Sequence, residues 1–221
     1  ETFALIEQEH ISHNEKATVG IIICGWNMPE GPYNKWPRRT EEYKNFIALI
    51  RYLIDKIGVR VCLMSHQNKV TADLELTKGN DHKIIDEILN LLKNDYAPED
   101  LFTLKHFYNA AQSKTIIEQF DMLMSGRIHG AVQGLSQFVP TAIIEYGHEP
   151  KAHKHRGFAK VYEVEEYVCN PADEQEMIRV ATKLWEDREK VKIHLHSQIP
   201  KVQELANYTF RLLHQLTSEG K

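Results

Sequence analysis

An arginine and a histidine stand two residues apart in the stretch SGRIHG, residues 125–130. The guanidinium of Arg127 is a planar fork of N–H donors that can bind a carboxylate or a phosphate through two hydrogen bonds. The imidazole of His129 changes charge near neutral pH, so it can give a proton to a bound anion. Together these residues predict an anion clamp and a general acid, with Gly126 and Ile128 of the same turn as substrate-binding residues.

The sequence around this pair predicts the end of a strand and the start of a helix. DMLMS, residues 121–125, is a short apolar run typical of a buried strand, and HGAVQGLSQF, residues 129–138, has a helical pattern. The free N–H groups and partial positive charge of a helix N-terminus favour an anion. Arg127 and His129 can equally be a capping residue, an interdomain ion pair or a satisfied structural group, and this alternative stays open.

The rest of the chain alternates between apolar strand-like runs and helical patterns. This order predicts an α/β fold, a Rossmann-like parallel sheet with helices on both faces, whose ligand site lies beyond the carboxyl ends of the strands. Strands are expected at residues 19–24, 59–65, 101–107, 121–125, 140–147 and 160–168, and helices at residues 41–57, 81–93, 109–120, 129–138 and from 172 to about 216.

The two ends of the chain carry separate expectations. Residues 1–17 are polar and predict a lead-in or linker remnant, so that the Rossmann-like domain comprises residues 18–221. Pro200 is expected to separate or kink two long helices. Apolar residues of these helices are expected to cover the sheet or a second half of the protein rather than form a dimer seam; they include Leu184, Trp185, Leu205, Phe210 and Leu213.

Composition narrows the classes of function. Apolar residues make up 42% and charged residues 26% of the 221-residue chain, as in ordinary globular proteins. A net charge of -4 disfavours nucleic acid as a partner, and the absence of an apolar run of about 20 residues predicts no transmembrane segment. Three widely spaced cysteines indicate a reducing compartment and no zinc site. The expected location is the cytoplasm, with peripheral membrane association left open.

The stretch HEPKAHKHR, residues 148–156, contains three histidines, a residue type that binds metals. No acidic or cysteine residue stands at a recognisable ligand interval from its histidines. The stretch is therefore expected to be a flexible loop facing the anion, with no metal.

The segment SGRIHGAVQGLSQFVPTAIIEYGHEPK, residues 125–151, resembles the polysaccharide pyruvyl transferase family. That family has a strand ending in sgRlH, a helix of small residues, then vPtaiieY and a lysine. VGIIICGWN, FIALIRYLI and LMSH also stand where the C-terminal domain of that family has them. The resemblance implies the C-terminal half of a GT-B glycosyltransferase fold. It also implies an N-terminal domain of the same protein as a partner, absent from these residues.

The resemblance further implies an activity. Family members transfer pyruvate from phosphoenolpyruvate to a sugar as a ketal, so the expected partners are phosphoenolpyruvate and a sugar or glycan acceptor, without a cofactor. Arg127 would hold the carboxylate or phosphate of the donor, and His129 would protonate its enol methylene. By itself the chain is expected to bind the donor and to lack turnover.

Further residues follow from the same likeness and from their places at strand ends. Lys151 matches the lysine of the family and would contact phosphate. Glu145, Tyr146 and His66 follow strands at the same edge and would line the pocket. Family members often carry an arginine after the first strand, where this chain has CGWNMPEG, so that contact is expected to be absent or taken by Arg38 or Arg39.

Two other functions stay open on the sequence. One is a nucleotide-sugar glycosyltransferase or epimerase, in which the same helix N-terminus would hold a diphosphate. The other is a catalytically silent module, in which Arg127 and His129 brace an interface between domains. The sequence predicts neither the acceptor sugar, nor the ketal positions, nor the oligomeric state.

Overall fold

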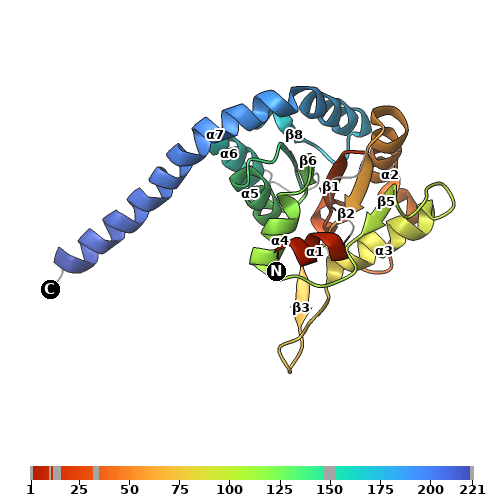
Figure 1. Ribbon diagram of the computed structural model, residues 1–221, viewed down its shortest axis with the longest axis horizontal. Helices are drawn as coiled ribbons and strands as arrows, with labels where there is room; N and C mark the ends of the chain where they lie inside the picture. The colour runs from red at the N-terminus through yellow and green to blue at the C-terminus, as the bar shows by residue number, and fades with distance from the viewer. Residues whose placement is uncertain (1, 10, 12–15, 32–34, 147–152, 220–221) are drawn as a thin grey trace.

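A computed structural model of the protein describes residues 2–9, 11, 16–31, 35–146 and 153–219. Its main feature is a six-stranded parallel sheet in the order β5-β2-β1-β6-β7-β8 (Figure 1). The strands are β1 (Thr18–Ile22), β2 (Arg60–Leu63), β5 (Leu101–Thr103), β6 (Met122–Ser125), β7 (Thr141–Ile144) and β8 (Val168–Cys169). The chain order reverses between β1 and β6, which is where open parallel sheets bind ligands.

Helices connect the strands and cover both faces of the sheet. They are α1 (Thr2–Gln8), α2 (Lys44–Tyr52), α3 (Asn80–Leu92), α4 (Ala110–Ile117), α5 (Ile128–Ser136), α6 (His153–Tyr162) and α7 (Glu174–Glu219). Shorter helical turns are η1 (Gly25–Asn27), η2 (Thr40–Tyr43), η3 (Leu53–Ile57) and η5 (Glu165–Tyr167). The predicted α/β fold is confirmed.

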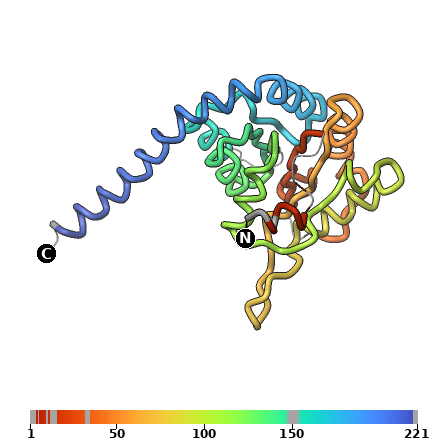
Figure 2. The backbone as a smooth tube through the Cα atoms, viewed as in Figure 1, coloured from red at the N-terminus to blue at the C-terminus, as the bar shows by residue number. Residues whose placement is uncertain are grey.

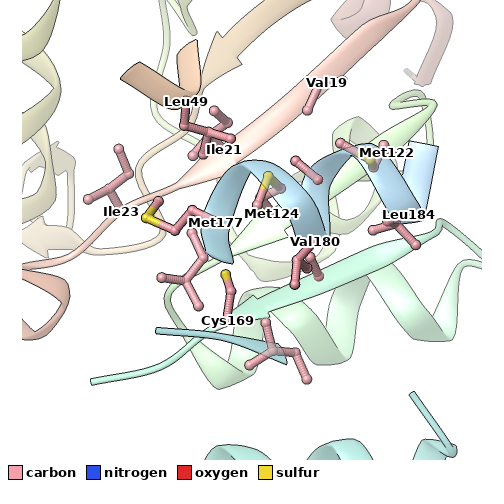
Figure 3. Packing of buried hydrophobic residues seen from close by; sticks show 14 of the residues in the cluster. Val19, Ile21, Ile23, Leu49, Met122, Met124, Cys169, Met177, Val180 and Leu184 are labelled. Atoms are coloured by element: carbon pink, nitrogen blue, oxygen red, sulfur yellow. The ribbon is translucent and has the colours of Figure 1, made fainter. Parts of the chain in front are cut away.

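Alternation along β1 divides the core into two layers. Val19 and Ile21 point to one face, where the core includes Leu49 of α2 and Val180 of α7, while Ile22 points to the other. Period-two alternation places neighbouring residues on opposite faces of a sheet. The first layer is shown from close by in Figure 3, where α7 lies over β1 and β6; its labelled residues include Met122, Met124, Met177 and Leu184.

The second half of α7 leaves the body of the protein. Helix α7 continues through Pro200 as one helix of 46 residues and extends away from the sheet (Figures 1 and 2). The proline therefore does not separate two helices, because the helix tolerates the one backbone N–H that proline lacks. Leu184 is buried and covers the sheet as expected, but Leu205, Phe210 and Leu213 are exposed and do not.

Three local expectations were wrong. The strand expected at residues 160–168 is confined to β8, because α6 runs to Tyr162 and buries Ala159 and Tyr162 on one helical face. Helix α6 begins at His153, so residues 153–156 of the predicted anion-facing loop are helical, whereas 147–152 lie outside the described residues. The loop after β2 contains an unpredicted hairpin of β3 (Asn68–Val70) and β4 (Leu76–Lys78).

The segment expected to be a lead-in packs against the domain. Residues 2–8 form α1, and the buried carboxylate of Glu9 accepts hydrogen bonds from the backbone N–H groups of Lys105 (2.7 Å) and His106 (3.1 Å). Ile11 is buried with residues of α4. These contacts join the start of the chain to the loop that follows β5.

Candidate functional site

The carboxyl ends of four neighbouring strands bring the candidate residues to one edge of the sheet. Cys24 follows β1, His66 follows β2, Arg127 follows β6, and Glu145 follows β7. Strands that run in parallel end at the same edge, so residues distant in the sequence become neighbours. Cys24 is buried, and burial raises the pKa of its thiol to about 11. It is therefore a neutral thiol at pH 7 and not a nucleophile.

The turn from β6 into α5 is held close to the neighbouring strand. The N–H of Gly126 donates to the carbonyl of Ile22 (2.7 Å), and the Ser125 hydroxyl donates to the carbonyl of Arg127 (2.8 Å). A Cβ atom on Gly126 would lie 2.0 Å from Oδ1 of Asn27, which explains a glycine here. Arg127 has extended backbone angles and precedes the first residue of α5, so it stands at the helix N-terminus.

The guanidinium of Arg127 is fastened along one edge. Its Nε donates to Oδ2 of Asp81 and its Nη2 to Oδ1 of the same carboxylate, both at 2.6 Å. Nη2 also donates to Oε1 of Gln67 (3.1 Å), whereas Nη1 makes no hydrogen bond with any residue that the structure describes. Asp81 is fully buried, and 19% of the Arg127 side chain is exposed. Burial lowers the pKa of Arg127, but the hydrogen bonds and charge of Asp81 outweigh it and raise the pKa.

Two histidines stand at this edge of the sheet, one after β2 and one in the first turn of α5. His66 is half-buried, and its Nε2 lies 3.1 Å from Oε1 of Gln133 on α5. Burial lowers the pKa of His66, the bond to Gln133 opposes this, and the charges of Arg127 and His129 lower the pKa further. The imidazole of His66 is therefore neutral at pH 7. His129 is exposed on the first turn of α5.

The buried side chain of Asn27 joins three strand ends. Its Oδ1 accepts from the N–H of Cys24 (2.9 Å), and its Nδ2 donates to the carbonyl of Glu145 (3.0 Å). Nδ2 also lies 3.4 Å from the carbonyls of Gly126 and Ile144. One side chain thus connects the ends of β1, β6 and β7. Asn27 is 2% exposed, so its side chain serves the packing of these strand ends and not the surface.

Replacement of Asn27 by alanine is expected to lower the free energy of unfolding by about 3 kcal/mol, because it leaves several buried backbone groups without a partner. Urea denaturation measures this loss. Asn109→Ala is the control, since Asn109 caps α4 through a single hydrogen bond to the N–H of Gln112 (3.0 Å). The control should lose about 1 kcal/mol. Equal losses in the two variants would contradict the proposed joining role of Asn27.

Aromatic rings continue the site beyond β7. The ring of Tyr146 lies 5.8 Å from that of Trp26 and 4.3 Å from that of His155. Burial raises the pKa of Tyr146 to about 12. His155 is fully buried, and neither of its ring nitrogens has a hydrogen-bond partner among the described residues. Burial, assisted by the charge of Lys154, lowers the pKa of His155 to about 4.

This buried imidazole predicts a loss of stability in acid. Its pKa of about 4 in the folded protein lies below its value in the unfolded chain, so between about pH 6.5 and pH 4 only the unfolded chain takes up a proton. Stability is therefore lost as the pH falls through this window, by about 2 kcal/mol from this group. Urea denaturation at pH 7 and pH 4.5 should show a smaller acid loss in His155→Phe than in the wild type.

The control for this prediction is His214→Phe, because His214 lies on the exposed part of α7. This variant should keep the pH dependence of the wild type. The same acid loss in His155→Phe and in the wild type would mean that His155 takes up its proton without unfolding.

Other predicted site residues occupy different surroundings. Glu145 is buried and accepts from Nη2 of Arg156 (2.7 Å). The Arg38 side chain is 1% exposed and pairs with Glu42 (2.9 Å). The carboxylate and the guanidinium are each engaged in an ion pair. Lys151 and His148 lie outside the described residues.

Sequence reasoning missed three residues of the site: Asp81, Gln67 and the structural role of Asn27. Asp81 stands in the first turn of α3, where an acidic residue is usually explained by the helix dipole. No pattern connects it with an arginine 46 residues later, so no signal in the sequence could have paired them. Glycines in the turn, by contrast, were a usable signal of close backbone approach.

Among the described residues, no three His, Cys, Asp or Glu side chains are grouped so as to hold a metal ion. The described helices include none that is both long and apolar enough to span a bilayer.

Comparison with known proteins gives one family and a set of similar folds. A family profile described as polysaccharide pyruvyl transferase matches residues 10–148. A search of curated proteins finds no match. The family match contains β1, β2, β6 and β7 and therefore every strand whose end contributes to the site.

Solved structures resemble the chain in fold at low sequence identity. A trehalose-6-phosphate synthase (OtsA) superposes with a TM-score of 0.57 and 10% identity, covering 98% of this chain and 49% of that one. The N-terminal domain of a trehalose-6-phosphate phosphatase from Candida albicans gives 0.52 and 12%, with coverages of 98% and 45%. A structure titled trehalose-6-phosphate from E. coli, bound with UDP-2-fluoro glucose, gives 0.53 and 11%, with coverages of 91% and 47%. The chain thus spans about half the length of these structures, and the likeness supports a GT-B-like Rossmann fold.

Proposed function

Because the chain belongs to the polysaccharide pyruvyl transferase family, we propose that it binds phosphoenolpyruvate and provides the donor side of a transferase that forms pyruvate ketals on a glycan. Family and fold together indicate a transferase. The donor, the ketal product and the acceptor are parts of the proposal. The proposed acceptor side comes from a further domain of the same protein.

One observation carries the proposal: Arg127 stands at the N-terminus of α5 with one edge of its guanidinium fixed and Nη1 without a bond among the described residues. Nη1 and the free N–H groups of the first turn of α5 are donors suited to a carboxylate or phosphate oxygen. Phosphoenolpyruvate carries both groups on the same carbon atom. Anion binding here would also offset the partial positive charge of the helix end.

The proposed reaction begins with a proton. His129 gives a proton to the methylene carbon of the bound phosphoenolpyruvate. That carbon becomes a methyl group, and the adjacent carbon becomes cationic. One sugar hydroxyl adds to this carbon and releases its proton. The second hydroxyl then displaces inorganic phosphate and releases its own proton, which completes the ketal. Arg127 stabilises the negative charge that collects on the departing phosphate.

The two histidines differ in what they can supply to this reaction. His129 is exposed in the first turn of α5 and is the proposed acid. His66 is neutral at pH 7 because burial and nearby positive charge lower its pKa, so it can accept a proton from the attacking hydroxyl. Replacing a group of this kind typically costs about a hundredfold to a thousandfold in rate.

Calorimetric titration tests the donor. Phosphoenolpyruvate should bind the wild-type chain, and UDP-glucose should not. Arg127→Lys should weaken binding at least about tenfold, because lysine has no second terminal nitrogen to offer the ligand while it pairs with Asp81. Arg51→Lys is the control, since Arg51 forms an exposed pair with Asp95 (2.8 Å). Binding of UDP-glucose alone would support a nucleotide-sugar transferase or epimerase. Binding of neither ligand would support a silent module and overturn the proposal.

Turnover requires the acceptor side as well. Phosphate release from phosphoenolpyruvate should be measured with the full-length protein and a panel of glycans carrying adjacent or 1,3-related hydroxyl pairs. His129→Gln should lower the release rate by about a hundredfold or more while donor affinity changes little. A variant that keeps the full rate would exclude His129 as the acid.

A further inference from the structure

We propose that Asp81 is a positioning residue, which holds the guanidinium of Arg127 in the orientation that presents Nη1 to the anionic donor. This inference rests on the proposed function and deepens it. Asp81 belongs to α3, 46 residues before Arg127, and neither the family motif nor the sequence pattern assigns it a role. Its action would be indirect, through Arg127.

The geometry fixes which atoms of Arg127 remain for a ligand. Nε and one N–H of Nη2 point to the two oxygens of Asp81 at 2.6 Å, and the other N–H of Nη2 points to Gln67 at 3.1 Å. A guanidinium has five N–H donors; the described residues engage three of them and leave the two on Nη1. Rotation of the guanidinium about its long side chain would break all three bonds at once.

Burial makes this arrangement firm. Asp81 is fully buried, and a buried carboxylate is stable only when it is paired and hydrogen-bonded. The start of α3 is itself fastened to the loop after β2, because His82 Nε2 lies 3.1 Å from Oδ1 of Asn68 and Gly79 packs on the backbone of Gln67. Asp81 and Gln67 are therefore held in place and together fix the orientation of the guanidinium.

The charge of Asp81 acts against anion binding, which gives the inference its sharpest test. A buried carboxylate cancels part of the positive field of Arg127, so on charge alone its removal would strengthen binding of an anion. Its orienting effect has the opposite sign, because a mobile guanidinium must lose rotational freedom when the ligand binds. At this site, the orienting effect of Asp81 on the guanidinium outweighs the effect of its charge on anion binding.

The experiment compares Asp81→Asn with the wild type by calorimetric titration of phosphoenolpyruvate. Asparagine keeps the size and one acceptor oxygen but removes the charge and the second bond. The dissociation constant is expected to rise about tenfold or more, as it does when outer partners of a binding group are removed. Unchanged or tighter binding would overturn the inference, because Asp81 would then be only a counter-charge.

A second variant separates orientation from charge and does not depend on the folding of Asp81→Asn. Gln67→Met removes the bond to Nη2 at constant charge and nearly constant volume. The dissociation constant should rise by about threefold, in the same direction as for Asp81→Asn. The matched control for Asp81→Asn is Asp121→Asn, at the opposite edge of the sheet, where Asp121 accepts a hydrogen bond from the N–H of Thr18 (2.8 Å). It should change affinity by less than about twofold, since distant charges are screened by salt.

Two readouts distinguish positioning from a merely structural pair. In the Arg127→Lys background, Asp81→Asn should weaken binding no further, because a residue that acts through Arg127 has no effect once the fork is gone. By NMR, the Nε–H signal of Arg127 should exchange slowly with water in the wild type and rapidly in Asp81→Asn. Additive losses, or an Nε–H signal that stays protected in Asp81→Asn, would overturn the inference.

Failure of this inference differs from failure of the proposed function. Wild-type protein that does not bind phosphoenolpyruvate overturns both, and slow Nε–H exchange would then report an ion pair with no role in donor binding. Wild-type binding that is lost in Arg127→Lys but kept in Asp81→Asn overturns the positioning role alone.

Discussion

Arg127→Met is expected to lower the free energy of unfolding by about 3–5 kcal/mol, the cost of leaving a buried carboxylate without its partner. Asp81 is fully buried and receives two hydrogen bonds of 2.6 Å from this arginine. Methionine keeps the length and packing of the side chain but supplies neither charge nor donor. Urea denaturation measures the loss, and the double variant Arg127→Met/Asp81→Asn should recover about 2 kcal/mol, because the unpaired charge is then gone.

An exposed ion pair of the same chemistry is the control for that result. Arg51 and Asp95 lie 2.8 Å apart with 53% and 40% of their side chains exposed, so Arg51→Met should cost less than about 1 kcal/mol. A double variant no more stable than Arg127→Met would show that the loss comes from packing rather than from the stranded charge. The loss of stability also affects binding experiments. A poorly folded Arg127 variant would fail to bind the ligand because it is unfolded, and not because the guanidinium is missing. Arg127→Lys, which keeps the charge, is the better variant for titrations.

Gly79→Ala is expected to lower the free energy of unfolding by about 3 kcal/mol and to weaken the site at the same time. A Cβ atom at this position would lie 2.0 Å from the carbonyl oxygen of Gln67 and 2.8 Å from its carbonyl carbon. Both are backbone atoms, so relief requires the start of α3 to move away from the loop after β2. That movement would separate Asp81 and Gln67, which together hold Arg127. Urea denaturation and phosphoenolpyruvate titration measure the two effects.

Gly157→Ala is the matched control for this substitution. Gly157 lies within α6, and a Cβ atom there would have no neighbour within 4 Å. Alanine is the better helix former by about 1 kcal/mol, so this variant should be as stable as the wild type or more so. If Gly79→Ala also kept full stability, the close approach between α3 and the loop after β2 would be wrong.

The position of the site bears on what the isolated chain can do. The hydrogen-bond donors around Arg127 lie at the edge of the sheet where the strands have their carboxyl ends. They are next to the point between β1 and β6 where the strand order reverses. The chain spans about half the length of the solved structures that it resembles, and their likeness concerns the fold alone. Binding of phosphoenolpyruvate, the proposed ligand, is therefore the property to measure first on this chain.

The spacing of apolar residues predicted most of the fold, because it reflects which residues of each helix or strand are buried. The apolar runs at β1, β2, β6 and β7 are buried on both faces, so their sequences carry the signal of a parallel sheet without reference to other segments. The pattern failed where local and tertiary signals disagree. Residues 160–162 alternate like a strand but form the end of α6, where Tyr162 is buried and Val161 is exposed. Leu205, Phe210 and Leu213 follow a helical pattern without covering the sheet.

The sequence by itself determined that an arginine and a histidine stand at the end of a buried strand, because strand, turn and helix are contiguous in the chain. Only the tertiary structure decided which atoms of that arginine are available. Its partner Asp81 comes from another helix, and His66 comes from another strand end. The physical reason is that a parallel sheet brings strand ends together through crossovers of many residues, so contacts across its edge leave no spacing in the sequence.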